Sequence, residues 1–178
     1  MHRKARLLVL PAACLVLLAG ASVGSADPRG TTAPATSLQA ELLDQVNALR
    51  VARGLPRLRL SRALSTAANG HSTQMARLGY FSHNSANGAP FSSRIARFYP
   101  ARGFRRWMVG ENLVYGAPDI GAARALRLWL SSPPHRANLL SARWREIGLA
   151  AVHSTSAPGV YGGRAATIVT ADFGARAR

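Results

Sequence analysis

The sequence predicts an α+β domain, in which helices pack on an antiparallel sheet, because helical patterns come first and strand patterns come last. Apolar residues recur at helical spacing up to about residue 140, whereas two segments after Trp144 are rich in small and β-branched residues. Helices followed by strands are typical of this fold class. With 178 residues, 48% of them apolar, the chain can form one domain with its own core.

The N-terminus has the pattern of a signal peptide. Three basic residues, Arg3, Lys4 and Arg6, precede an apolar run over residues 7–18. That run is too short to span a membrane as a helix, and small residues surround a cleavage position after Ala26. An uncleaved membrane anchor is the alternative to cleavage.

This pattern divides the chain into three parts. We expect a signal peptide over residues 1–26, a flexible Pro-, Gly- and Thr-rich leader over residues 27–36, and the folded domain over residues 37–176. The single cysteine, Cys14, lies in the signal peptide, so the exported chain should contain no disulfide. We also expect no transmembrane span in the exported chain. The expected location is therefore extracellular, or periplasmic where an outer membrane is present.

Two long helices are predicted at the start of the domain. The first opens at a capping box of Thr36 and Gln39 and ends at Gly54, and the second opens at Ser61 and ends at Gly79. Their apolar stripes are Leu42, Val46 and Leu49 in the first helix, and Leu64, Ala68, His71, Met75 and Leu78 in the second.

Three shorter helices and a hairpin follow. One helix is expected within residues 91–98, a second is capped by Asp119, and a third runs from Pro134 to Leu140. Two strands, over residues 146–152 and 165–173, are expected to pair in an antiparallel hairpin with a long, Gly-rich connection.

Five sequence strings occur in an order that resembles a known family. They are LLDQVNALRVARGLPRL, AANGHSTQMARLGYFSHNSANGAPFSSRI, VGENLVYG, WLSSPPHRANLLSARWREIGLA and TADFG. Together they resemble the CAP superfamily, which joins cysteine-rich secretory proteins, antigen 5 and plant pathogenesis-related proteins. The resemblance is greatest to its cysteine-free, SCP-like bacterial branch, and it runs from about Leu38 to Gly174.

The resemblance implies an α-β-α sandwich, with helices on both sides of a small antiparallel sheet, and a central cleft. By motif position, the cleft residues are His83 in FSH, Glu111 in GEN and His135 in SPPHR. Ser132 stands where animal and plant relatives usually carry a second glutamate. His83, His135 and Glu111 would form a metal-binding set of two imidazoles and one carboxylate, which suits Zn²⁺.

The other candidate residues are expected to have no direct functional role. His71 lies on an apolar helical stripe and is expected to be a core histidine, while His153 receives no role. No serine has a G-x-S-x-G context and no H-E-x-x-H motif occurs, which argues against a serine hydrolase and a common zinc-protease helix.

Three functional hypotheses remain open. The first is a secreted CAP-domain protein whose cleft binds a divalent metal, a small ligand or a lipid. The second is a metal-assisted hydrolase or protease, in which Glu111 acts as the base. The third is an arginine-rich module that binds anionic envelope polymers, since the net charge is +16.

A nucleic acid is not expected as the partner. The densest basic group is Arg94, Arg97, Arg102, Arg105 and Arg106, with aromatic residues between them. That combination can bind nucleic acid, but the chain carries an export signal and matches no nucleic-acid-binding module.

Overall fold

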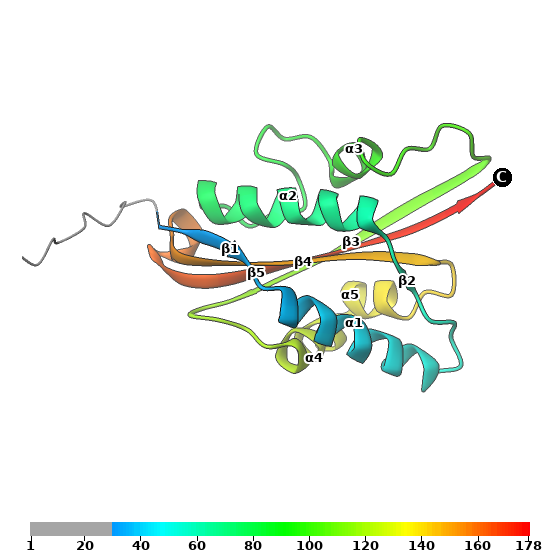
Figure 1. Cartoon of the computed structure of the whole chain (residues 1–178), viewed down its shortest axis with the longest axis horizontal. Helices are drawn as coiled ribbons and strands as arrows, with labels where there is room; N and C mark the ends of the chain where they lie inside the picture. Colours follow the sequence, from blue (N-terminus) through cyan, green and yellow to red (C-terminus); the bar gives the residue numbers. More distant parts are fainter. Residues whose placement is uncertain (1–29) are drawn as a thin grey trace, which may run out of the picture.

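A sheet runs through the middle of the molecule, and helices cover both of its faces. The structure, a computed structural model, describes residues 30–178. Helices α2 and α3 lie on one face, whereas α1, α4 and α5 lie on the other (Figure 1). The helices are α1 (Thr36–Val51), α2 (Arg62–Leu78), α3 (Phe91–Ala96), α4 (Ala122–Ser131) and α5 (Pro133–Leu139). This arrangement confirms the α+β class and the α-β-α sandwich.

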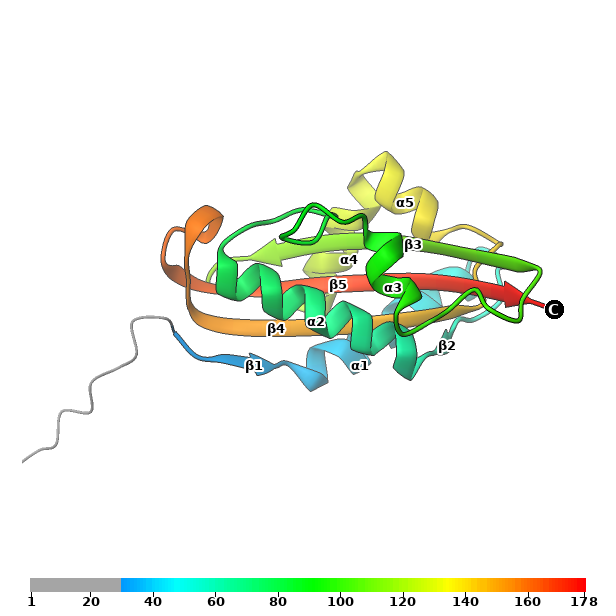
Figure 2. The same ribbon diagram turned by 90° about the horizontal axis from the view of Figure 1, so that it is seen from above.

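The sheet places one long strand at an edge. Its strands are β1 (Thr32–Pro34), β2 (Arg59–Leu60), β3 (Arg106–Gly116), β4 (Glu146–Ala157) and β5 (Arg164–Ala177). The order is β1-β4-β5-β3, where β2 pairs with β4 in parallel and the other pairs are antiparallel. Strands β4 and β5 form the expected hairpin, and β3 lies at the edge of the sheet on the side of α5 (Figure 2).

Helix α2 begins and ends where the sequence predicts. The Ser61 hydroxyl accepts a hydrogen bond from the Leu64 amide at 3.5 Å, which caps the N-terminus. Gly79 ends the helix in the left-handed conformation, with φ of 74°. A Cβ atom at Gly79 would lie 2.7 Å from the carbonyl carbon of Pro158, so both its conformation and its packing require glycine.

Two other helix starts differ from their predictions. The capping box of Thr36 and Gln39 was wrong, because Ala35 is the N-cap of α1 and no side chain caps it. The Ala35 amide donates instead to the Ala151 carbonyl at 2.8 Å, so pairing with β4 determines where α1 begins. Helix α4 begins after Gly121 and not at Asp119, because Ile120 is buried before the helix starts.

The latter part of the predicted leader is ordered in a strand. Residues Thr32–Pro34 pair with β4 from Ser154 to Val152, so this part of residues 27–36 is not a free leader. The predicted signal peptide and the start of the leader, residues 1–29, lie outside the described residues. Between residues 30 and 178, no helix combines the length and the apolar content needed to cross a bilayer.

The sequence analysis missed β3. The apolar pattern of this strand is interrupted in the middle by Gly110, Glu111 and Asn112, so the sequence does not predict a buried strand there. The polar side chains of Glu111 and Asn112 are nevertheless buried, because each forms hydrogen bonds with one of the two helical layers.

The sheet separates two apolar cores. Along β5, alternate side chains point to opposite faces, as in any strand. Phe173 packs with α1, α4 and α5, whereas Ile168 packs with α2. Leu78, expected on the inner stripe of α2, is 61% exposed at the end of that helix.

Candidate ligand-binding cleft

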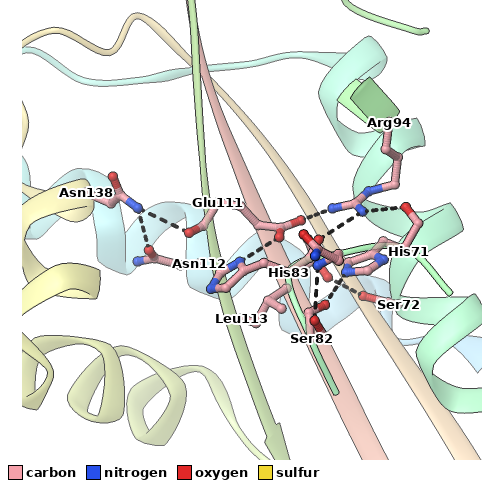
Figure 3. Close-up of polar contacts among 12 residues, drawn as sticks. His71, Ser72, Ser82, His83, Arg94, Glu111, Asn112, Leu113 and Asn138 are labelled. Atoms are coloured by element: carbon pink, nitrogen blue, oxygen red, sulfur yellow. Dashed lines mark hydrogen bonds and ion pairs between the residues drawn. The ribbon is translucent and has the colours of Figure 1, made fainter. Parts of the chain in front are cut away.

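The site lies on edge strand β3, where two neighbouring residues point to opposite helical layers. Glu111 faces the layer of α2 and α3, where Arg94 contacts it, and Asn112 faces α5, where it contacts His135. The site is thus built from both layers at the edge of the sheet (Figure 3). Asn112, like Glu111, belongs to strand β3.

Glu111 is the centre of a buried charge network. Its side chain is 0% exposed, and each carboxylate oxygen has a partner. His83 Nδ1 donates to Oε1 at 2.7 Å, and the Arg94 guanidinium donates to Oε2. Arg94 also donates to the His83 carbonyl at 3.3 Å and to the Ser85 hydroxyl at 3.1 Å. The carboxylate is therefore fixed from two sides, and it fixes His83 in turn.

His83 and His135 approach each other from opposite layers. His83 lies in the loop after α2, and His135 lies in α5, with ring centroids 6.5 Å apart and ring planes inclined by 43°. Because Nδ1 of His83 is bonded to Glu111, its Nε2 is the nitrogen left to face a ligand. Burial, and then the neighbouring His83, lower the pKa of His135 below its ordinary value.

Two asparagines fix α5 against β3. Asn112 Nδ2 donates to the His135 carbonyl at 3.0 Å. Asn138 Nδ2 donates to the Glu111 carbonyl at 3.1 Å and to Asn112 Oδ1 at 2.9 Å (Figure 3). These bonds set the position of His135 relative to Glu111, which gives both asparagines a structural role.

An apolar cavity of about 270 Å³ adjoins His135. Ser132, the residue before α5, lies in its wall, so the structure places this predicted cleft residue beside His135. Phe81 and Tyr115 form an edge-to-face pair there, with centroids 4.9 Å apart. The lining residues are Phe81, Leu113, Val114, Tyr115, Leu128, Trp129, Ser132 and His135.

A second carboxyl group lies next to Glu111. Asp172 is opposite Glu111 in the β3–β5 register, and its side chain is buried. Neither of its oxygens has a hydrogen-bond partner among residues 30–178. Burial, and then the charge of Glu111, raise the pKa of Asp172 well above its ordinary value.

His71 is a core histidine, as expected. Its ring is fully buried, and Nε2 donates to the Ser82 carbonyl at 2.9 Å, one residue before His83. Burial lowers the pKa of His71 to about 4, so the ring is neutral near pH 7. It therefore supports the loop that carries His83.

The sequence analysis missed two members of the site, Arg94 and Asp172. Arg94 was counted with the surface arginines, although it precedes the buried Ile95 on a short helix. Asp172 was quoted within TADFG without a role. An acidic residue inside an otherwise apolar, β-branched strand was the signal that could have identified it.

Comparison with known proteins identifies the family. A family model described as "CAP: Cysteine-rich secretory protein family" matches residues 43–173. The chain belongs to this family. The resemblance inferred from the five sequence strings is thereby confirmed.

The chain covers different shares of the known proteins that it resembles. The "Uncharacterized membrane protein YlbC" of Bacillus subtilis (strain 168) is 32% identical over 114 residues, which are 64% of this chain and 31% of that protein. An extracellular protein containing a SCP domain from Bacillus anthracis str. Ames is 29% identical, with a TM-score of 0.59 and coverage of 78% of this chain and 40% of that one. The chain thus spans less than half the length of either protein.

A third protein shows the fold alone. An outer surface protein from Borrelia burgdorferi has a TM-score of 0.67 and 21% identity, with coverage of 83% of this chain and 98% of that one. This CAP fold therefore also occurs as a domain of nearly the same extent.

The metal-ligand set of this CAP domain can be tested against the contacts of its side chains. Both oxygens of Glu111 are engaged, so this carboxylate is placed to orient His83 and not to ligate directly. Between residues 30 and 178, no group of three or more His, Cys, Asp or Glu side chains is arranged to hold a metal ion. The donors that remain for a metal are the two imidazoles, which suit Zn²⁺ chemically.

Proposed function

We propose that this protein is an exported CAP-domain protein that binds a small ligand in the cleft between His83 and His135. The observation that carries the proposal is the pairing of these imidazoles, which come from opposite layers and lie 6.5 Å apart. Glu111 and Arg94 hold His83 in place before any ligand arrives, and this preorganisation lowers the entropic cost of binding.

The cavity beside His135 supports a ligand with an apolar part. Tyr115 and Leu128, at 37% and 42% exposed, leave apolar surface open to solvent next to the imidazoles. A ligand that places a polar group between the histidines would place its remainder against this surface. A small amphipathic molecule or a lipid has this character, and an imidazole pair can reach it directly or through a divalent metal.

Zinc is the probe that tests the imidazole pair. When bound, Zn²⁺ supplies a positive charge that attracts an anionic or carbonyl group of the ligand. His83 and His135 are the residues that would hold it, and Glu111 keeps the Nε2 of His83 directed outward.

Calorimetric zinc titrations of the wild type and of His83→Ala and His135→Ala provide the test. Each substitution should weaken zinc binding by about tenfold or more, because each removes one of two neutral nitrogen ligands. The matched control is His153→Ala, which removes an imidazole on β4 that is bonded to Thr167 of β5, away from the cleft. Equal zinc affinity in the wild type and the double variant would overturn the metal-binding part of the proposal.

A metal-assisted hydrolase is less well supported by the geometry. A general base needs a carboxylate oxygen that can reach the attacking water. Both Glu111 oxygens are bonded to His83 and Arg94, so ligand binding without an assigned reaction fits the contacts better.

Export is supported by the signal-peptide pattern of residues 1–26 and by the relatives' names. One relative is described as extracellular, whereas another is described as a membrane protein. Mass spectrometry of protein recovered from the culture medium should give an N-terminus at Asp27 or within a few residues of it. Recovery of an intact Met1 in that fraction would contradict signal cleavage.

A further inference from the structure

The fold gathers arginines from two distant segments at one end of the sheet. The start of β3 and the end of β5 lie together there (Figures 1 and 2). Arg105 and Arg106 lie at the start of β3, and Arg143 lies in the turn between α5 and β4. These three line a groove of about 520 Å³ with Trp107 and Met108, which we name the arginine groove.

The guanidinium groups of the arginine groove are free to meet a partner. Arg105, Arg106 and Arg143 are exposed, and none forms an ion pair within residues 30–178. The acid at this end of the sheet, Glu146, is already engaged: Tyr99 donates to it at 2.5 Å, and Arg59 lies 3.7 Å away. The positive charge of the groove is therefore not neutralised by the fold.

The other acidic residues lie elsewhere in the described part of the chain. Glu41 and Asp44 are on α1, Asp119 follows the far end of β3, and Glu111 and Asp172 are buried beneath the cleft. Several like charges held together without counter-charges repel each other, and they create a positive field that a polyanion relieves.

The structure differs from the sequence in which arginines belong to this surface. Arg94, counted by sequence in the dense basic group, is paired with Glu111 inside the molecule. Arg176 lies over the Tyr99 ring at 3.7 Å and the Phe104 ring at 4.6 Å, so its guanidinium is held between two aromatic rings. The groove draws instead on Arg143, which lies nearly 40 residues from Arg106 in the sequence.

We propose that the arginine groove binds a linear anionic polymer whose charges are phosphate groups. Arginine forks match phosphate oxygens two at a time, and the spread of three unpaired guanidiniums suits a chain of charges better than one small anion. Trp107 and Met108 give the groove an apolar floor for the polymer backbone. Of the aromatic rings nearby, Tyr99 is not available for base stacking, since it is buried and the Arg176 guanidinium lies over its ring.

The test compares two triple variants that remove the same charge. Arg105→Gln/Arg106→Gln/Arg143→Gln alters the groove, and Arg77→Gln/Arg124→Gln/Arg127→Gln alters exposed arginines of α2 and α4. Long-chain inorganic polyphosphate is the probe, and binding is measured by fluorescence anisotropy at several salt concentrations. Urea unfolding of both variants confirms that each is folded, since none of these side chains is buried.

The groove variant should lose about tenfold or more in affinity, and its dependence on salt should weaken by about two counterions, because three phosphate contacts are lost. The control variant should lose less than about threefold, since it changes net charge but not the site. Equal losses in both variants would show that net charge alone binds the polymer and would overturn the proposal. Displacement by orthophosphate at the same phosphate concentration would also overturn it, as would tighter binding to phosphatidylglycerol vesicles than to polyphosphate.

Discussion

Glu111 and Asp172 face each other across β3 and β5, so that two carboxyl groups lie side by side beneath the cleft. Residues directly opposite on an antiparallel pair have Cβ atoms about 5 Å apart, and like charges at that spacing are destabilising. Arg94 and His83 bond both oxygens of Glu111, whereas neither oxygen of Asp172 has a partner in residues 30–178. Burial and the charge of Glu111 raise the pKa of Asp172, which favours its protonated form and limits the repulsion between the two groups.

The substitution Asp172→Asn should therefore stabilise the protein as the pH rises. A carboxyl with a raised folded-state pKa binds more protons when folded than when unfolded, so its contribution to stability falls above the unfolded value of 3.8. Relative to the wild type, the variant should gain stability at pH 7 and gain little at pH 4. Urea unfolding at both pH values measures the difference. An equal loss of unfolding free energy at pH 4 and pH 7 would show that the Asp172 carboxyl makes a hydrogen bond that the amide cannot replace.

His71 should give the opposite pH dependence. Its pKa is about 4 when folded and 6.5 when unfolded, so between these values the unfolded state binds more protons. Stability should fall as the pH drops from 6.5 towards 4, by roughly 3 kcal/mol from this residue if the whole window is crossed.

The substitution His71→Met tests this expectation because it fills the site without a titrating group. The variant should be less stable than the wild type at pH 7, since the bond to Ser82 is lost, but its unfolding free energy should change less between pH 7 and pH 4.5. His153→Gln, at a half-buried ring bonded to Thr167, is the matched histidine control. Parallel pH curves for His71→Met and the wild type would contradict the assignment.

Removal of Arg94 should destabilise the fold strongly. The substitution Arg94→Met leaves Glu111 buried with His83 as its remaining side-chain partner, and loss of one partner from a buried ion pair costs about 3–5 kcal/mol. Arg97→Met, at an exposed arginine three residues on, should change the unfolding free energy by less than about 0.5 kcal/mol.

A double variant separates the buried charge from the lost packing. Arg94→Met/Glu111→Gln should be more stable in urea than Arg94→Met alone, because no unpaired carboxylate remains. The same loss in the single and double variants would mean that Arg94 acts through packing.

The contact between α2 and β4 should not tolerate a methyl group at Gly148. A Cβ there would lie 2.1 Å from the Leu64 carbonyl carbon and 2.2 Å from the Ser65 amide nitrogen, so the helix would have to move off the sheet. Gly148→Ala should cost about 3 kcal/mol or more in thermal or urea unfolding. Gly70→Ala, at an open position within α2, should instead stabilise by roughly 0.5–1 kcal/mol. A neutral result at Gly148 would show that the two elements lie further apart than described.

Features that depend on local chemistry could be predicted from the sequence. Ser61 and Gly79 limit α2 because a serine cap and a left-handed glycine act within one turn of the chain. His83, Glu111 and His135 were found through the family motifs, and the structure brings the two histidines and the carboxylate together.

Features that depend on strand register could not be predicted. The adjacency of Asp172 and Glu111 requires β3 to be recognised as a strand and then paired residue by residue with β5. The contact between Arg94 and Glu111 requires α3 to pack on the same face of β3 as α2. No local sequence pattern predicts on which face of a strand a helix packs. Arg143 joins Arg105 and Arg106 for the same reason, since these two segments meet only after the layers assemble.

The attachment of the two histidines to opposite layers has a consequence for how such a cleft changes during evolution. His83 lies on the α2 side of the sheet and His135 on the α5 side, so the gap between them depends on how both layers pack against β3. A bulkier residue beneath either layer would widen the gap without touching the cleft itself. Ligand size can therefore be selected through buried residues such as Met75 or Leu139, which do not line the cavity themselves.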